Sequence, residues 1–330
     1  MTDTAELANR IRAGDRRALA RAITLIESTR PDHRAAATEL LDRLAERGAG
    51  AMRIGLSGTP GVGKSTFIEA FGQMLTRIGL RVAVLAVDPS STRSGGSILG
   101  DKTRMPELAR DPNAFIRPSP SQTALGGVAR RTREAIALCA AAGYDLVLVE
   151  TVGVGQSETM VAQMTDLFVL LLAPAGGDEL QGVKRGIMEI ADLILVNKAD
   201  GDLLAAARRT RADYAGALQL LRRRPQDPEG FPRALCVSAA DGTGLDAAWE
   251  AMRALADWRR DSGVWAARRA EQARSWFADE VQAGLMARLA ADAGLARMTE
   301  ELGRAVAEGR ASPTAAAAEV LATFDAKTGA

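Results

Sequence analysis

Gly58-Thr59-Pro60-Gly61-Val62-Gly63-Lys64-Ser65, continued by Thr66, is the stretch that decides the fold of this chain. It has the spacing G-x-x-x-x-G-K-[ST], follows an apolar run at 52–57 and leads into a helical pattern, as a phosphate-binding loop requires. The glycines let backbone N–H groups converge on phosphate oxygens, and the helix adds the positive end of its dipole. We therefore predict a nucleoside triphosphate site here, with Lys64 at the β- and γ-phosphates and the Ser65 hydroxyl on Mg²⁺.

Apolar runs typical of strands buried on both faces alternate with helical patterns from residue 52 onward. The later strand-like runs are 81–88, 114–116, 145–150, 166–173, 192–196 and 234–237, and helical patterns lie at 64–77, 124–142 and 203–221. The alternation predicts the fold class α/β, with a doubly wound, mostly parallel sheet around the P-loop and helical extensions at both ends. Ligands of such sheets lie at the carboxyl ends of the strands, where this chain has Asp88, Glu150 and Asn197.

The motif Asn197-Lys198-Ala199-Asp200 follows one of these predicted strands. The Asp200 carboxylate can accept hydrogen bonds from both N–H groups on one edge of guanine, and adenine has no matching pair of donors, so discrimination of roughly 10⁴-fold is expected. Asn197 and Lys198 are expected to brace the loop and cover the base. Backbone N–H groups of Ser238-Ala239-Ala240, at the end of the next strand, are expected to meet guanine O6. GTP is therefore the predicted substrate and GDP the product.

Three acidic residues are candidates for holding Mg²⁺ and the attacking water. Glu150-Thr151-Val152-Gly153 ends a strand where many GTPases have Asp-x-x-Gly, so Glu150 is expected at the metal and the Gly153 N–H at the γ-phosphate. Asp88 and Asp101 lie at the two ends of a long polar loop, and either one can ligate the metal while the other holds water. The candidate catalytic residues are Lys64, Asp88, Asp101 and Glu150, and the candidate Mg²⁺ ligands are Ser65, Asp88, Asp101 and Glu150.

Two further features bear on turnover. Val154 stands where a glutamine would orient the attacking water, so slow intrinsic hydrolysis is predicted. The stretch 176–184 has three glycines and two acids, together with Gln181 and Lys184. It is predicted to be a loop with two states that senses the nucleotide or contacts a partner, with an ordinary linker as the alternative.

The P-loop GTPase domain is expected to span residues 48–256, and helical segments flank it. Residues 1–47 are expected to form an N-terminal extension of two helices, separated at Arg30-Pro31, with Asp32 capping the second helix. Residues 257–330 are expected to form a C-terminal helical dimerisation arm. A satellite of the core is the alternative for this last segment.

The C-terminal segment has the apolar spacing of a long helix. Phe277, Val281, Leu285 and Leu289 recur every four residues, and Gly294 is expected to interrupt the helix. Ser312-Pro313 is expected to begin the last helix, with the serine as N-cap and the proline at the first helical position. An apolar helical extension beyond a complete α/β domain needs a surface to cover, which favours self-association.

Bulk composition gives little support for a nucleic-acid or membrane partner. The formal net charge is +1, with 25% charged and 47% hydrophobic residues, and no apolar run has the length of a membrane span. Cys139 and Cys236 are far apart in the sequence, so reduced thiols are expected. The acidic N-terminus leads straight into a helical pattern and gives no sign of a signal peptide, so a cytoplasmic location is expected.

With these motifs established, the chain resembles the MeaB/ArgK family of P-loop GTPases over nearly its whole length. The resemblance rests on the P-loop together with Val87-Asp88-Pro89-Ser90-Ser91, Gly100-Asp101-Lys102-Thr103-Arg104-Met105, Glu150-Thr151-Val152-Gly153-Val154-Gly155-Gln156-Ser157-Glu158, Gly176-Gly177-Asp178-Glu179-Leu180-Gln181-Gly182 and Asn197-Lys198-Ala199-Asp200. The second to fourth of these motifs, counting the P-loop as the first, are specific to this family.

The resemblance implies a G-protein chaperone of an adenosylcobalamin-dependent acyl-CoA mutase, most often methylmalonyl-CoA mutase. Such proteins gate delivery of intact cofactor, protect or reactivate the mutase, and form homodimers through the C-terminal arm. Gln181 and Lys184 would lie in a third switch that couples partner binding to hydrolysis. No cobalamin site is predicted in this chain itself. Isobutyryl- and ethylmalonyl-CoA mutases remain alternative partners.

Two other functions compete with the chaperone. A GTPase metallochaperone for nickel or cobalt would need a Cys/His cluster, and this chain has one histidine and two separated cysteines. A nucleotide-binding module without significant turnover is the other alternative, which Val154 keeps open for the isolated protein.

Overall fold

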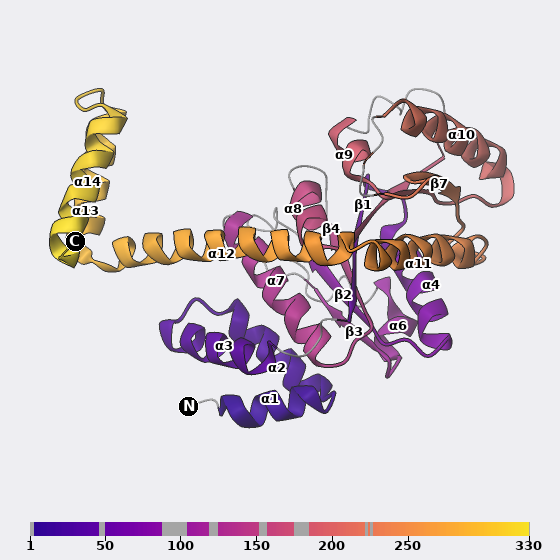
Figure 1. Ribbon diagram of the computed structural model, residues 1–330, viewed down its shortest axis with the longest axis horizontal. Helices are drawn as coiled ribbons and strands as arrows, with labels where there is room; N and C mark the ends of the chain where they lie inside the picture. The colour runs from indigo at the N-terminus through magenta and orange to yellow at the C-terminus, as the bar shows by residue number, and fades with distance from the viewer. Residues whose placement is uncertain are drawn as a thin grey trace. The chain divides into compact units, whose positions relative to one another are not determined.

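The computed structural model describes residues 3–45, 50–87, 104–118, 125–151, 157–174, 185–221, 224 and 227–329. The chain divides into two compact units, residues 1–269 and residues 270–330 (Figure 1). The domain boundaries expected from the sequence, at 47/48 and 256/257, stay predictions.

A seven-stranded parallel sheet forms the centre of the first unit, in the order β3-β2-β4-β1-β5-β6-β7. The strands are β1 (Met52–Gly58), β2 (Val82–Val87), β3 (Ala114–Arg117), β4 (Leu146–Thr151), β5 (Leu167–Leu172), β6 (Leu193–Val196) and β7 (Arg233–Cys236). Every residue of β2, β4, β5 and β6 is buried, so these strands are covered on both faces, as their unbroken apolar runs predicted. The predicted α/β fold class is confirmed.

Helices cover both faces of this sheet (Figure 1). The helical segments of the first unit are α1 (Thr4–Arg12), α2 (Arg16–Glu27), α3 (Pro31–Leu44), α4 (Lys64–Arg77), α6 (Pro106–Arg110), α7 (Leu125–Ala141), α8 (Ser157–Met164), α9 (Arg185–Ile190), the 3₁₀ turn η3 (Gly201–Leu203), α10 (Leu204–Leu220) and α11 (Leu245–Asp261), and α12 (Val264–Ala291) begins there. Phe67 and Phe71 of α4 stack with centroids 5.2 Å apart, and Phe71 meets the edge of Trp249 in α11. These contacts join α4 and α11 into the apolar layer on one face of the sheet.

The N-terminal extension packs on α7 and has three helices, so the prediction of two helices was wrong. The break falls at Gly14, whose φ of +79° ends α1, and at Asp15, whose carboxylate accepts hydrogen bonds from two N–H groups of α2. Asp32 does not cap α3, because Arg30 is the N-cap residue and Pro31 is the first helical residue. Asp32 instead forms an exposed ion pair with Arg30.

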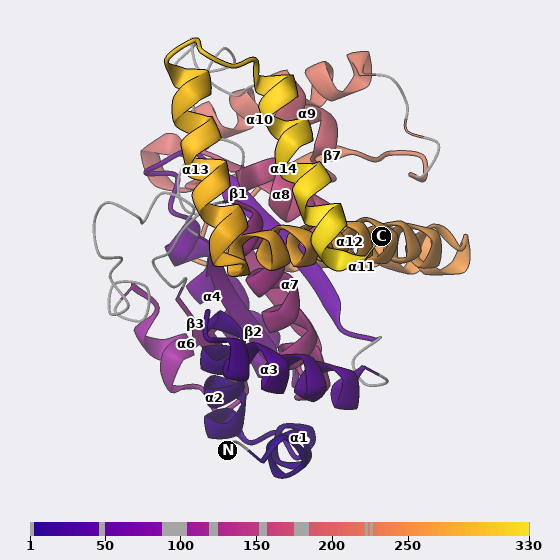
Figure 2. The same cartoon turned by 90° about the vertical axis from the view of Figure 1, so that its left-hand side faces the viewer.

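The second unit contains the end of α12 together with α13 (Ala293–Ala307) and α14 (Pro313–Thr328), which lie side by side (Figure 2). The break expected at Gly294 falls two residues earlier, at Asp292. The Asp292 carboxylate caps α13 and also pairs with Lys327, 2.7 Å away in the last turn of α14. Ser312 caps α14, with Pro313 at its first position, as predicted.

Within the described ranges, no helix is both long and apolar enough to cross a membrane. The two cysteines are free, with Cys139 buried and Cys236 partly buried. Burial raises the pKa of the Cys139 thiol to about 12.

Candidate functional site

The P-loop joins the carboxyl end of β1 to the first residue of α4, and its backbone requires glycine at two positions. A side chain on Gly58 would place its Cβ 2.4 Å from the carbonyl oxygen of Leu171 on the neighbouring strand. Gly63 is the N-cap residue of α4 and has a φ of +87°, which side chains rarely tolerate. The sequence therefore positions the amino end of a fourteen-residue helix directly over the loop.

Lys64 holds its ammonium group over this loop. Its Nζ donates hydrogen bonds to the carbonyl oxygens of Gly58 at 2.7 Å and Thr59 at 3.4 Å. Partial burial lowers the pKa of Lys64 below its ordinary value, and the carboxylates of Glu150 and Glu158 oppose that change. Acidic residues from two neighbouring elements therefore counteract part of the effect of burial on the charge of Lys64.

Asn197 ties three loops together at the carboxyl edge of the sheet. Its Nδ2 donates to the carbonyl oxygen of Val62 in the P-loop at 2.9 Å, and its Oδ1 accepts from the N–H of Ala239 at 3.1 Å. Only 1% of Asn197 is exposed, so both bonds are made in a dry setting. These two bonds are consistent with the predicted bracing role of Asn197, because its side-chain amide links the two predicted base-binding loops to the phosphate loop.

Lys198 adds a second link between the same loops. It has a φ of +57°, an unusual conformation for a residue with a side chain, and its neighbour Asn197 is buried while Lys198 is exposed. Its Nζ donates to the carbonyl oxygen of Gly61 at 2.8 Å. The aliphatic stem therefore extends from the N-K-x-D motif to the P-loop, where it can cover a base.

Asp200 is held by a serine from the neighbouring loop. The hydroxyl group of Ser238 donates to Oδ2 of Asp200, and the same oxygen of Ser238 accepts from the N–H of Asp241 at 3.3 Å. Ser238 is fully buried, and its backbone N–H donates to Thr243 in the same turn. The structure thus brings together the N-K-x-D motif and the loop Ser238-Ala239-Ala240 that the sequence predicted to face the base.

Glu150 lies beside the start of the P-loop, in register with Leu56 of β1. Its side chain is almost completely buried, and the next residue, Thr151, donates to Ser57 at 2.9 Å. Magnesium prefers oxygen ligands such as hydroxyls and carboxylates. The Ser65 hydroxyl and the Glu150 carboxylate therefore fit the chemistry of a Mg²⁺ site at this edge.

Five residues of the predicted site lie outside the described ranges, so their predicted roles stay predictions. They are Asp88, Asp101, Gly153, Gln181 and Lys184.

Two roles within the described part of the site were not predicted. The hydroxyl group of Ser238 positions Asp200, although the sequence indicated only backbone N–H groups for that loop. Glu158, buried in the first turn of α8, acts electrostatically on Lys64. Neither role leaves a signal in the sequence, because Ser238 and Asp200 lie 38 positions apart and Glu158 carries no spacing that places it near Lys64.

Comparison with known proteins adds independent findings. The family model described as methylmalonyl-CoA mutase-associated GTPase MeaB matches residues 19–294. A protein of Caulobacter vibrioides named putative GTPase is 53% identical over 322 residues, which are 98% of this chain and 98% of that protein. The mitochondrial methylmalonic aciduria type A homolog of Mus musculus is 50% identical over 324 residues, covering 95% of this chain and 78% of that protein.

A solved structure agrees with these sequence relatives. The crystal structure titled LAO/AO transport system kinase has a TM-score of 0.75 and 39% sequence identity to this chain. The similarity covers 98% of this chain and 99% of that one.

Proposed function

This chain belongs to the MeaB family of P-loop GTPases, and on that premise we propose that it is a GTP-hydrolysing chaperone of an adenosylcobalamin-dependent acyl-CoA mutase. Methylmalonyl-CoA mutase is the first candidate partner, since the matching family model carries that enzyme in its description. In this proposal the protein gates delivery of intact cofactor and protects or reactivates the mutase. In this proposal the protein acts in the cytoplasm, and the adenosylcobalamin site belongs to the mutase.

One observation carries the nucleotide part of the proposal: the carboxylate of Asp200, held by Ser238, lies on a motif that Asn197 and Lys198 fasten to the P-loop. A bound guanine would donate two N–H groups to Asp200, while the P-loop N–H groups and Lys64 would bind the phosphates. Since one linked set of loops would contact both ends of the nucleotide, loss of the γ-phosphate can change the positions of all of these loops.

Mg²⁺, when bound, would neutralise charge on the β- and γ-phosphates. Ser65 and Glu150 would hold it, with Asp88 and Asp101 contributing a ligand and a contact to the attacking water. Lys64 would stabilise charge that develops as the γ-phosphate is transferred to water. Because Val154 cannot orient that water, hydrolysis would be slow until the partner docks, with Gln181 and Lys184 in the coupling loop.

A homodimer is the second part of the proposal. In the second unit, the exposed fractions of Phe277 and Leu285 are 71% and 50%, and Val281 between them is 46% exposed. Apolar side chains every four residues on one helix form a stripe that a second copy can cover. Light scattering of the full chain is expected to give twice the monomer mass, and Leu285→Glu is expected to lower it. A monomeric full-length protein would contradict this part.

The deciding experiment measures GTP turnover with and without purified methylmalonyl-CoA mutase and adenosylcobalamin. A slow basal rate that rises at least about tenfold with the mutase supports the chaperone. The Lys64→Met variant, which lacks the cation at the phosphates, is the control without GTP hydrolysis. A flat rate with this mutase and with related acyl-CoA mutases would contradict it. Turnover absent under every condition would favour the nucleotide-binding module, and turnover stimulated only by a nickel or cobalt enzyme would favour the metallochaperone.

A further inference from the structure

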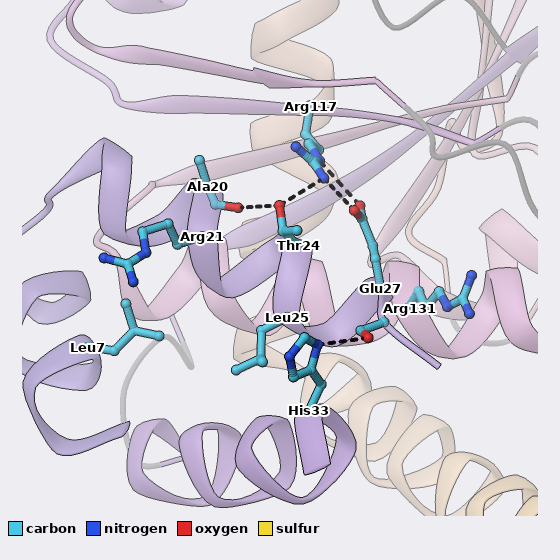
Figure 3. Close-up of a pocket in the computed structure, with 10 residues that line it drawn as sticks. Leu7, Ala20, Arg21, Thr24, Leu25, Glu27, His33, Arg117 and Arg131 are labelled. Atoms are coloured by element: carbon cyan, nitrogen blue, oxygen red, sulfur yellow. Dashed lines mark hydrogen bonds and ion pairs between the residues drawn. The ribbon is translucent and has the colours of Figure 1, made fainter. Parts of the chain in front are cut away.

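A cavity of about 640 Å³ lies between the N-terminal extension and the GTPase core, away from the nucleotide site. Residues of α1, α2 and α3 line it together with Arg117 at the end of β3 and Arg131 on α7 (Figure 3). Its size is within the range of pockets that enclose small molecules. Nothing in the proposed GTPase mechanism uses it.

Arg131 is a buried charged residue in the wall of this cavity. Its exposed fraction is 8%, and within the described residues its guanidinium makes no hydrogen bond or ion pair, so Nε is a buried donor without an acceptor. Burial lowers the pKa of Arg131 and the neighbouring Arg130 lowers it further, whereas Glu27 and Glu134 act in the opposite direction. Buried charges in proteins are normally paired, because an unpaired one loses its hydration without compensation.

The nearby carboxylates are already engaged. Glu27 pairs with Arg117, and Glu134 accepts from Arg34 at 2.7 Å, with Arg130 at 3.9 Å. Among the described residues, neither of these carboxylates forms an ion pair or a hydrogen bond with Arg131, although both act on it electrostatically. Its charge is therefore available to an anion that enters the cavity.

The rest of the wall is partly apolar. Leu7 and Leu25 face the cavity, and Figure 3 shows Leu25 and His33 between Arg131 on one side and Leu7 with Arg21 on the other. Arg21 is exposed and marks the outer rim, whereas Arg131 is buried. A ligand that complements both the charged and the apolar part of this wall needs one anionic group and an apolar body.

We propose that this cavity binds a small organic anion, whose carboxylate or phosphate head pairs with Arg131 and whose apolar body packs on Leu7 and Leu25. Binding would join the N-terminal helices to β3 and α7 through the ligand. The proposal does not depend on the mutase partner or on GTP turnover.

Calorimetric titration of the full-length protein with octanoate and octyl phosphate tests the proposal, with octanol and inorganic phosphate as the matched controls. Saturable binding of either amphipathic anion is expected, at least about tenfold tighter than binding of octanol or phosphate, because a charge-assisted hydrogen bond and apolar burial both contribute. Octanoate binding alone would identify a carboxylate site, and octyl phosphate binding alone a phosphate site. No saturable binding, or equal binding of octanol or phosphate, would overturn the proposal.

Variants separate binding from folding. Arg131→Met keeps an unbranched apolar stem and removes the charge, so it is expected to abolish anion binding while the melting temperature stays the same or rises. Arg21→Gln, at the rim, is expected to weaken binding several-fold, and Arg17→Gln on the same helix but outside the cavity is expected to change nothing. A large loss of stability in Arg131→Met would show a structural partner for this arginine and overturn the proposal, as would unchanged binding in both cavity variants.

Discussion

At the amino edge of the sheet Asp192 is enclosed by two arginines, whereas at the carboxyl edge Asp200 accepts its hydrogen bond from a serine hydroxyl. Asp192 precedes β6 and Asp200 follows it, so the same strand carries both acids. The first is completely buried and the second is partly exposed. The two carboxylates therefore have different tasks, although sequence alone presents each as an acid flanking one apolar strand.

At the amino edge, buried arginines and carboxylates neutralise one another. Arg259, itself 1% exposed, contacts Asp192 at 2.6 Å and Asp227 at 2.5 Å, and Arg224 contacts the same two carboxylates. At the carboxyl edge the cations bond to backbone carbonyl groups instead: Lys64 to Gly58, and Lys198 to Gly61. An arginine network that neutralises its own acids holds the fold together, while lysines that rest on neutral carbonyls keep their charge for a ligand.

The largest predicted effect tests the carboxyl edge. Asp200→Asn replaces an acceptor with a donor at the guanine edge, so GTP affinity is expected to fall by about 10²- to 10⁴-fold while xanthosine triphosphate gains affinity. Titration with fluorescent nucleotide analogues measures both. Asp202→Asn, on the exposed turn two residues later, is the matched control and should bind GTP normally. Unchanged GTP affinity in Asp200→Asn would refute the guanine assignment.

The next effect tests the amino edge. Asp192→Asn leaves Arg259 without the carboxylate that contacts both of its terminal nitrogens, so the free energy of unfolding is expected to fall by about 3–5 kcal/mol. Urea unfolding measures this, and GTP affinity of the folded protein should not change. Asp257→Asn, which breaks the exposed pair with Arg260, is the control and should cost less than about 1 kcal/mol. An equal loss in both variants would refute the distinction between the two edges.

The same site gives a pH dependence. Burial alone would raise the pKa of Asp192, but Arg259 and Arg224 hold it below its ordinary value. A carboxyl group with a lowered pKa in the folded state stabilises the protein above its unfolded pKa of about 3.9, and that contribution is lost as the pH falls further. Unfolding titrations between about pH 5 and pH 2 should therefore show a steeper loss of stability in the native chain than in Asp192→Asn.

The sheet and the P-loop were predictable because their signals are local. Unbroken apolar runs gave all seven strands to within a residue or two, and Gly63-Lys64 placed the start of α4. The prediction for the N-terminal extension was wrong because two adjacent residues interrupt a continuous apolar pattern. Gly14 ends one helix, and Asp15 caps the next. Contacts between distant segments left no such pattern: Arg259 meets Asp192 across 67 positions and Ser238 meets Asp200 across 38.

The smallest effect concerns that last contact. Ser238→Ala removes the hydroxyl that positions Asp200, without changing the charge of the site or leaving a large space. The Asp200 carboxylate then has to be oriented by the base alone, so GTP affinity is expected to fall by about 5- to 15-fold, the equivalent of one hydrogen bond of about 1–1.5 kcal/mol. Ser262→Ala, at the end of α11 near the amino edge, should leave GTP binding unchanged. Because Ser238→Thr keeps the hydroxyl, it should recover part of the affinity that alanine loses. Full affinity in Ser238→Ala would mean that the base site is held by the Asn197 bridge and not by the serine, and that the carboxyl edge is as self-contained as the amino edge.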